Sequence, residues 1–142
     1  MTAPEVVALP ARRESLGQVH RFVEELASCA MLDEQRTYRL RLAAEEMATN
    51  IVEHARFPVG TGTGSFVLEG GVLPDLVWLR LVDSAEEFDP TAAPPPPDLH
   101  EPLDRRKVGG LGIHLTRQMV DEFRYQRIDG RNRTTLALRR PA

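Results

Sequence analysis

The chain has 142 residues, a length that fits one compact domain with its own core and is too short for two. Apolar residues make up 42% and charged residues 27% of it, and the net charge of −3 offers no basic surface to nucleic acid or to an acidic membrane. The single cysteine, Cys29, excludes an internal disulfide. No apolar run approaches the roughly 18 residues that span a bilayer, and the N-terminus does not resemble an export signal, so we expect a cytoplasmic protein.

The first part of the chain predicts one strand followed by two helices. Residues 5–11, "EVVALPA", indicate a short strand that ends near Pro10. Apolar residues at three- and four-residue steps then predict a helix, with Ser15 as its cap. Asp33 is expected to cap a second helix, which runs to about Ala55.

The middle of the chain predicts a hairpin and a long loop. Residues 57–64, "FPVGTGTG", form a turn-rich connector to strands at 65–72 and 76–82. Residues 84–108 contain six prolines and little periodicity, which favours an extended loop over a helix or strand. A loop of this length in a compact domain is typical of a lid or a binding segment, although an insertion without function has the same composition.

Regular structure returns in the last part of the chain. The apolar residues of 109–123, "GGLGIHLTRQMVDEF", predict a helix, and 124–140 predict a hairpin that turns near "DGRN". The order of the elements predicts an α/β two-layer sandwich, in which three helices cover one face of a mixed, mostly antiparallel sheet. We expect residues 1–142 to form this single domain.

Residues 45–54, "EEMATNIVEH", place acidic, amide and imidazole groups on one side of the second helix. At about 100° per residue, Asn50 lies roughly 40° from Glu46, His54 roughly 80°, and Glu53 about 20° in the other direction. Small and apolar residues occupy the opposite side. Such a stripe is rich in groups that bind metals or move protons, but alone it is equally typical of a solvated helix surface.

Two further features can join this stripe in one pocket. Asp83 ends an apolar strand, and "GGLG" (109–112) opens a helix directly after the loop. Backbone N–H groups at a glycine-led helix start bind phosphate oxygens, and a buried carboxylate accepts a hydrogen bond from an amine such as that of adenine. Taken singly, Asp83 is also consistent with a loop cap, and the glycines with a tight helix start. Their order along the chain favours a nucleotide site.

In this order the motifs resemble those of the superfamily that unites gyrase, Hsp90 and histidine kinase ATP-binding domains. "EEMATNIVEHA" resembles the N box of the superfamily, "VDSAEEFDP" its first glycine box and "GGLGIHLTRQMVDEF" its second. Within the superfamily, the chain is most similar to the stand-alone bacterial anti-sigma-factor serine/threonine kinases. The resemblance covers nearly the whole chain and implies the Bergerat fold, an α/β sandwich, with residues 84–108 as the ATP lid.

The resemblance also assigns a role to individual residues of an ATP site. It implies Glu46 as the general base, Asn50 as a ligand of Mg²⁺, Asp83 as the acceptor for adenine, Ala85 in the first glycine box beside the nucleotide, Thr135 as a hydroxyl near adenine, and Gly109, Gly110 and Gly112, with Leu111 among them, beside the phosphates.

The activity that the resemblance implies is partner switching. Such proteins bind a sigma factor, or an antagonist protein that they phosphorylate on serine or threonine, and they are often homodimers. The first glycine box departs from the family pattern, because Ala85 and Glu87 stand where glycines are usual. The methyl group of Ala85 fits if the backbone there is not left-handed, and Glu87 adds negative charge near the lid. The alternative hypothesis is therefore a degenerate relative that binds protein partners without catalysis.

Overall fold

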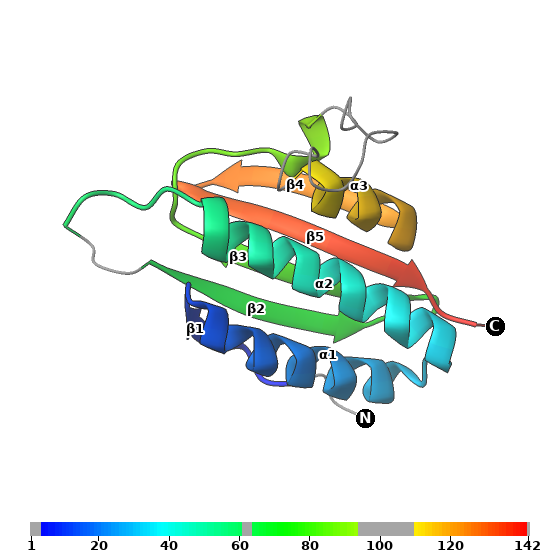
Figure 1. Ribbon diagram of the computed structural model, residues 1–142. Coiled ribbons are helices and arrows are strands. Elements are labelled where there is room, and N and C mark those ends of the chain that lie inside the picture. Colours follow the sequence, from blue (N-terminus) through cyan, green and yellow to red (C-terminus); the bar gives the residue numbers. More distant parts are fainter. Residues whose placement is uncertain (1–3, 61–63, 94–109, 142) are drawn as a thin grey trace.

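The computed structural model describes residues 4–60, 64–93 and 110–141. Within these ranges, five strands and three helices follow one another in the order predicted from the sequence (Figure 1). The elements are β1 (Val7–Pro10), the 3-10 turn η1 (Arg13–Ser15), α1 (Leu16–Ala30), α2 (Glu34–His54), β2 (Ser65–Val72), β3 (Leu76–Asp83), the 3-10 turn η2 (Pro90–Ala92), α3 (Gly110–Met119), β4 (Glu122–Ile128) and β5 (Arg131–Arg139).

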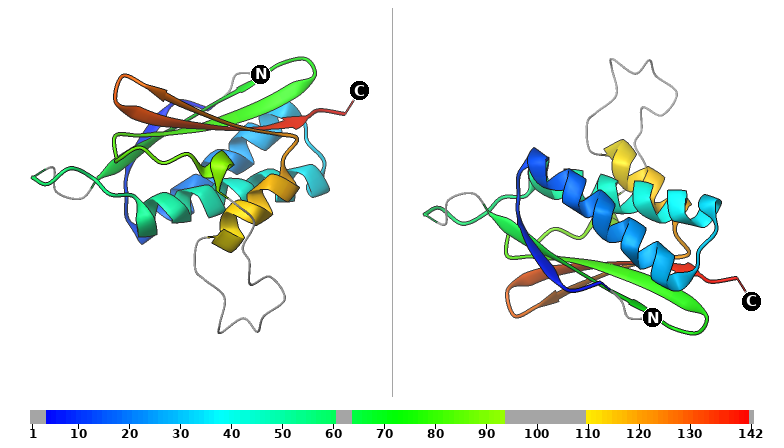
Figure 2. Two further views of the ribbon diagram at one scale, coloured as in Figure 1. Left: turned by 90° about the horizontal axis from the view of Figure 1, so that it is seen from above. Right: turned by 90° about the horizontal axis from the view of Figure 1, so that it is seen from below.

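The strands form one sheet in the order β1-β2-β3-β5-β4, and each neighbouring pair is antiparallel. The three helices cover the same face of this sheet (Figures 1 and 2), so the predicted two-layer sandwich is confirmed. The prediction of a mixed sheet is wrong. After the return along α3, β4 runs in the direction of β3, but β5 lies between the two strands, and no parallel pair forms among the described strands.

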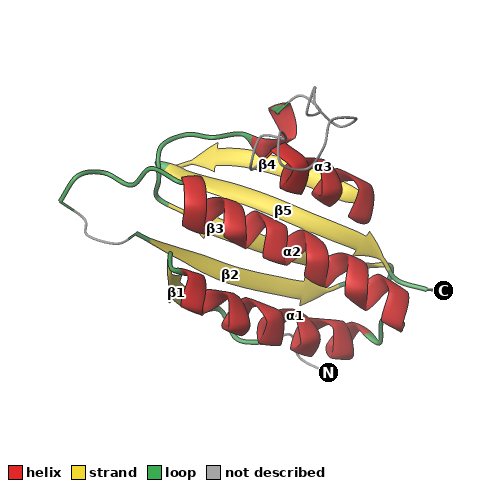
Figure 3. Cartoon of the chain, in the orientation of Figure 1, coloured by secondary structure: helices red, strands yellow, loops and turns green. Residues whose placement is uncertain are grey.

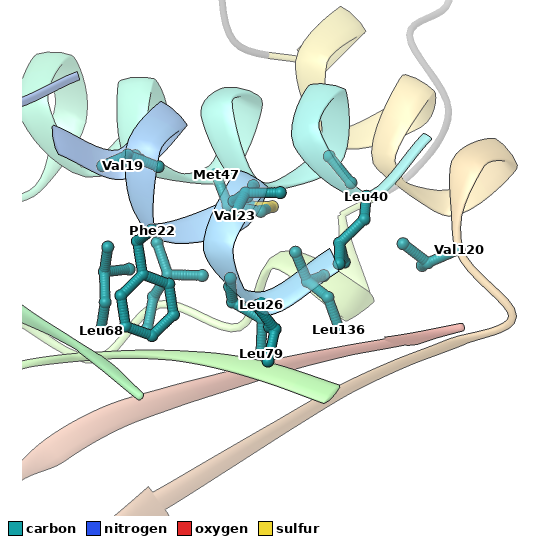
Figure 4. Close-up of a cluster of buried hydrophobic side chains, with 14 of the residues drawn as sticks. Val19, Phe22, Val23, Leu26, Leu40, Met47, Leu68, Leu79, Val120 and Leu136 are labelled. Atoms are coloured by element: carbon teal, nitrogen blue, oxygen red, sulfur yellow. The ribbon is translucent and has the colours of Figure 1, made fainter. Parts of the chain in front are cut away.

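Apolar side chains of both layers meet in one core (Figure 4). Burying a leucine side chain contributes roughly 1.5–3 kcal/mol relative to leaving it exposed, so this core, more than helix propensity, holds the helices on the sheet. The fully buried leucines that contribute to it include Leu26 of α1, Leu40 of α2, Leu68 of β2, Leu79 of β3 and Leu136 of β5.

The alternation along β3 and β5 brings polar residues to the helix-covered face at one end of the sheet. The register places Asp83 opposite Asn132. Because side chains two apart on a strand share a face, both polar residues continue an apolar row. The buried side chains of this face are Val77, Leu79, Leu81 and Asp83 on β3, and Asn132, Thr134, Leu136 and Leu138 on β5.

Two predicted helix starts have different outcomes. Asp33 caps α2 as predicted, because its carboxylate accepts a hydrogen bond from the backbone N–H of Arg36 at 2.7 Å. Ser15 precedes α1 but makes no capping bond. Its hydroxyl instead donates to the carbonyl of Pro10 at 2.6 Å, which ties the end of β1 to the start of the helix.

The predicted helix over 109–123 extends too far. In the structure α3 ends at Met119, and Phe123 lies on β4, opposite Leu136 of β5. The spacing of Val120 and Phe123 fits a helical stripe, but the two side chains reach the core from a link and a strand. The described part of the chain contains no helix that is long and apolar enough to cross a membrane.

Candidate functional site

A cavity of about 220 Å³ lies between α2 and the ends of β3 and β5. The loops that follow α2 and β3 lie at this end of the sandwich (Figure 3), where the N–H of Glu86 donates to the carbonyl of Arg56 at 2.8 Å. Apolar side chains from the helix and the sheet line the cavity, together with polar groups from α2, β3, β5 and the two loops. The lining residues include Met47, Asn50, Ile51 and His54 of α2, Leu81 and Asp83 of β3, Ala85, Glu87 and Phe88 of the following loop, and Asn132 and Thr134 of β5.

Neighbouring acids on α2 point to different partners. Glu45 faces α1, where its carboxylate lies 2.9 Å from Nδ1 of His20. Glu46 faces α3. Asn50 and His54, one and two turns further along, line the cavity. Residues of the predicted polar stripe therefore lie at two sites: Glu46 at the contact with α3, and Asn50 and His54 on the cavity wall.

The carboxylate of Glu46 lies directly against Gly112 in the first turns of α3. A Cβ atom built on Gly112 would stand 2.5 Å from Oε2 of Glu46, so only glycine leaves room for the carboxylate in this position. Burial raises the pKa of Glu46, and the negative charges of Glu45 and Glu53 raise it further. A carboxylate with a raised pKa is a better proton acceptor when ionised, as a general base requires.

Asp83 is 8% exposed and is one of the residues that line the cavity. Its Oδ1 accepts hydrogen bonds from the N–H of Ala85 and from the side-chain amide of Asn132, both at 2.9 Å. Among the described residues, Oδ2 has no hydrogen-bond partner. A buried carboxylate oxygen beside a cavity is suited to accept a hydrogen bond from a ligand amine.

Ala85 occupies its place without backbone strain. Among the described non-glycine residues, only Met31 and Asp129 have a positive φ, so neither Ala85 nor Glu87 has the left-handed backbone that favours glycine. Ala85 is 2% exposed, and its carbonyl accepts a hydrogen bond from Arg127 at 2.9 Å. The departure from the glycine pattern is therefore accommodated in the fold of the loop.

The second glycine segment is only partly described. Gly109 lies outside the described residues, Gly110 is the first residue of α3, and Leu111 is half-buried in its first turn. Of the predicted lid, 84–93 are described and 94–108 lie outside the described residues. The described end of this segment is held by Arg117 of α3, which donates to the carbonyl of Thr91 at 2.7 Å.

The structure does not bring Thr135, which is expected near the base, to the cavity. Thr135 is on the helix-free face of the sheet, where its hydroxyl accepts a hydrogen bond from Arg80 at 2.9 Å. Thr134, its neighbour, is 8% exposed and lines the cavity. Asn132 also lines the cavity, and it is not among the site residues predicted from the sequence. The alternation in "RNRTTLAL" contains the signal for both, because it places Asn132 and Thr134 on the face of the buried Leu136.

Asn50 is a cavity residue whose chemistry fits a magnesium ion. Its side-chain oxygen is a hard, neutral ligand, and Mg²⁺ in nucleotide sites takes one or two protein ligands and completes its shell with water and phosphate oxygens. Over the described residues, no three His, Cys, Asp or Glu side chains converge in a way that would hold a metal ion.

Comparisons with curated proteins find bacterial protein kinases. The serine/threonine-protein kinase BtrW of Bordetella bronchiseptica is 36% identical over 99 residues, which cover 70% of this chain and 68% of that protein. The serine-protein kinase RsbW of Bacillus licheniformis is 27% identical over 122 residues, covering 82% of this chain and 74% of that protein. The serine-protein kinase RsbW of Halalkalibacterium halodurans is 28% identical over 132 residues, covering 89% and 79%.

Solved structures share the fold at low identity. The RsbU and RsbW domains of Rv1364c from Mycobacterium tuberculosis match 97% of this chain with a TM-score of 0.64 and 18% identity, and the chain spans 32% of that structure. The histidine kinase domain of EL346 from Erythrobacter litoralis matches 96% of this chain with a TM-score of 0.53 and 14% identity, and the chain spans 65% of it.

A family model matches most of the sequence. The model of the histidine kinase-like ATPase domain matches residues 9–139, from β1 to the end of β5. With this match and the relatives above, the chain belongs to the family of histidine kinase-like ATPase domains.

Proposed function

We propose that the chain is an ATP-dependent protein serine/threonine kinase that regulates its partners by switching between them. The observation that carries this proposal is the carboxylate of Asp83, buried beside a cavity that Asn50 also lines. The family of ATPase domains and the relatives named as serine-protein kinases support it.

In the proposed complex, ATP binds with its base in the cavity. Oδ2 of Asp83 accepts a hydrogen bond from the exocyclic amine of adenine, and the apolar side chains of Met47, Ile51 and Leu81 contact the ring. Asn50 is the proposed ligand of Mg²⁺, which neutralises phosphate charge when bound. The glycine-led start of α3 is the proposed neighbour of the phosphates.

Glu46 is the proposed general base for the transfer step. The hydroxyl oxygen of a serine or threonine in the protein substrate forms a bond to the γ-phosphorus of ATP. The bond from that phosphorus to the oxygen bridging the β- and γ-phosphates breaks, and ADP leaves with this electron pair. The carboxylate of Glu46 accepts the hydroxyl proton, so charge and atoms balance.

Replacing Gly112 with alanine is expected to impair transfer by displacing Glu46. The new methyl group would lie within 2.5 Å of Oε2, and the carboxylate, the far end of a flexible side chain, is what must move. We expect the rate of transfer at saturating ATP to fall about tenfold or more, because misplacement of a catalytic group affects the chemical step. ATP affinity should fall as well, because the start of α3 is the proposed neighbour of the phosphates. A radiolabel transfer assay beside calorimetric ATP titration measures both, and an unchanged rate would contradict this role of Gly112.

The proposed protein partner is an antagonist protein that carries the phosphoacceptor, with a sigma factor as the alternative partner in the switch. The resemblance to the anti-sigma-factor kinases, which also implies a homodimer, is the basis for these partners. The phosphoacceptor is expected to be a serine or threonine hydroxyl, since the relatives are named serine- or serine/threonine-protein kinases.

One observation favours the alternative of a protein-binding module without catalysis. Glu87 lines the cavity and is exposed, so its negative charge lies where an anionic ligand would enter. Calorimetric titration with Mg·ATP, followed by incubation of the chain and an antagonist-domain protein with labelled ATP, separates the two functions. A kinase gives binding heat and label on serine or threonine of the antagonist, whereas the alternative gives complex formation without label.

A further inference from the structure

Asn132 lies at the start of β5, opposite Asp83 in the register of the sheet. It is 5% exposed and lines the cavity. Its side chain forms hydrogen bonds with both the end of β3 and the loop behind it. We propose that Asn132 is a positioning residue that makes the site selective for a purine with an amine at C6. This inference rests on the proposed function, since it concerns the base of the nucleotide.

The surroundings of the Asn132 amide fix which end is oxygen and which is nitrogen. Its oxygen accepts from the N–H of Phe88 at 3.3 Å, the hydroxyl of Tyr125 at 2.6 Å and the guanidinium of Arg127 at 3.0 Å. Its nitrogen donates to Oδ1 of Asp83 and to the carbonyl of Glu86, each at 2.9 Å. The reversed amide would set donor against donor at Phe88 and Arg127 and acceptor against acceptor at Glu86, so this orientation is the one that satisfies the groups.

This orientation determines which oxygen of Asp83 serves a ligand. Oδ1 already accepts two hydrogen bonds, one from Asn132 and one from the N–H of Ala85. Oδ2 is left with no partner among the described residues. An ionised carboxylate held in this way offers only an acceptor. It bonds the amine at C6 of adenine and repels the carbonyl oxygen that hypoxanthine and guanine carry there.

Asn132 also holds the loop after β3, in which Ala85 and Glu87 stand where glycines are usual in the family. It bonds the backbone of Glu86 and Phe88, on either side of Glu87. Ala85 and Glu87 have no left-handed backbone, so the loop is held by these side-chain bonds and not by glycine geometry. Phe88 lines the cavity while 48% exposed, so the same amide sets both the carboxylate and part of the wall around a base.

The test compares two nucleotides that differ at purine C6, where ATP carries an amine and ITP a carbonyl, and at the adjacent N1, which carries a hydrogen only in ITP. Calorimetric titration of the chain with Mg·ATP and Mg·ITP gives the preference for the amine over the carbonyl, which we expect to be about tenfold or more, as for one hydrogen bond to a charged acceptor. Asn132→Ala and Asn132→Asp each remove the donor to Asp83 and are expected to reduce the preference to about threefold or less. Asn132→Asp keeps the acceptor oxygen, so it also answers the question if the alanine variant does not fold.

Tyr125→Phe is the matched control. It removes a bond to the oxygen of Asn132 and leaves the donor to Asp83 in place, so the preference should stay within about twofold of the original. If both Asn132 variants weaken ATP and ITP by the same factor, or change neither, the inference is overturned while the proposed function stands. If the unsubstituted chain binds neither nucleotide, the proposed function fails and the inference fails with it.

Discussion

Replacing Glu46 with glutamine is expected to reduce the rate of phosphoryl transfer by about 10²–10⁴-fold, the range that general-base catalysis contributes. Glutamine keeps the shape of the side chain against Gly112 but cannot accept the hydroxyl proton. ATP affinity should stay within about threefold, because the residue is not part of the described cavity wall and acts on the hydroxyl of the substrate. Single-turnover transfer to an antagonist protein measures the rate, and calorimetry measures the affinity.

Glu45→Gln is the control for this substitution. Glu45 is the neighbouring acid on α2, and its carboxylate pairs with His20 of α1. Its removal takes away one of the charges that raise the pKa of Glu46, so the pH dependence of transfer should shift to lower pH, but the rate at neutral pH should change far less than in Glu46→Gln. The transfer rate should fall as the pH decreases through the pKa of Glu46, because the base becomes protonated. Since this pKa is raised, the midpoint of the fall should lie at a pH above 4.5, the ordinary pKa of a glutamate. Equal rates for the chain and its Glu46 variant would show that another group takes the proton.

Replacing Asp83 with asparagine is expected to weaken ATP binding by about 10–100-fold, since hydrogen bonds to charged groups contribute roughly 1.5–3 kcal/mol. The substitution keeps the size of the side chain and removes one acceptor. The amide nitrogen of the new asparagine is a donor and cannot accept a hydrogen bond. It would lie either toward the cavity, where the amine of adenine is also a donor, or toward the N–H groups of Asn132 and Ala85, which are donors too. Calorimetric titration with Mg·ATP measures the loss.

Asp121→Asn is the matched control for Asp83. Asp121 is also a carboxylate that accepts a backbone hydrogen bond, from the N–H of Arg139 at 2.8 Å, but it is not among the cavity-lining residues. Its substitution should leave ATP affinity unchanged. If Asp83→Asn binds ATP as tightly as the original chain, the carboxylate does not recognise the base.

The sequence allowed the elements and their order to be predicted because each has a distinct apolar period. The end of α3 was missed, since Val120 and Phe123 reach the same core from a link and a strand at a spacing that also fits a helix. The sheet was predicted to be mixed, whereas its described strands are all antiparallel. Strand order depends on β5 inserting between β3 and β4, and no local sequence pattern predicts this insertion.

At the site, position along a strand proved more informative than motif similarity. Asn50 and Asp83 were predicted and both line the cavity. Thr135 was assigned by likeness, although the alternation in β5 places its neighbour Thr134 on the inner face. The hydrogen bonds from Asn132 to Asp83, Glu86 and Phe88 join residues 44 to 49 positions apart in the chain, so only the folded sheet brings them together.

Gly112 shows how one residue type serves more than one purpose. The sequence assigned it to the phosphates, because glycine admits an anion to the backbone. The structure adds a second reason for glycine, which is the close approach of the carboxylate of Glu46. A motif can predict that glycine is needed at a position, but the group that needs the space is identified only by the neighbouring helix.

The most direct test is to follow the backbone amide signals of isotope-labelled protein during titration with Mg·ATP. The binding mode proposed here predicts saturable shifts that are largest at the cavity, in Asn50, Ala85 and Thr134, and little change on the opposite face of the sheet, in Trp78 and Thr135. No shift at millimolar nucleotide, or shifts confined to the helix-free face, would contradict it.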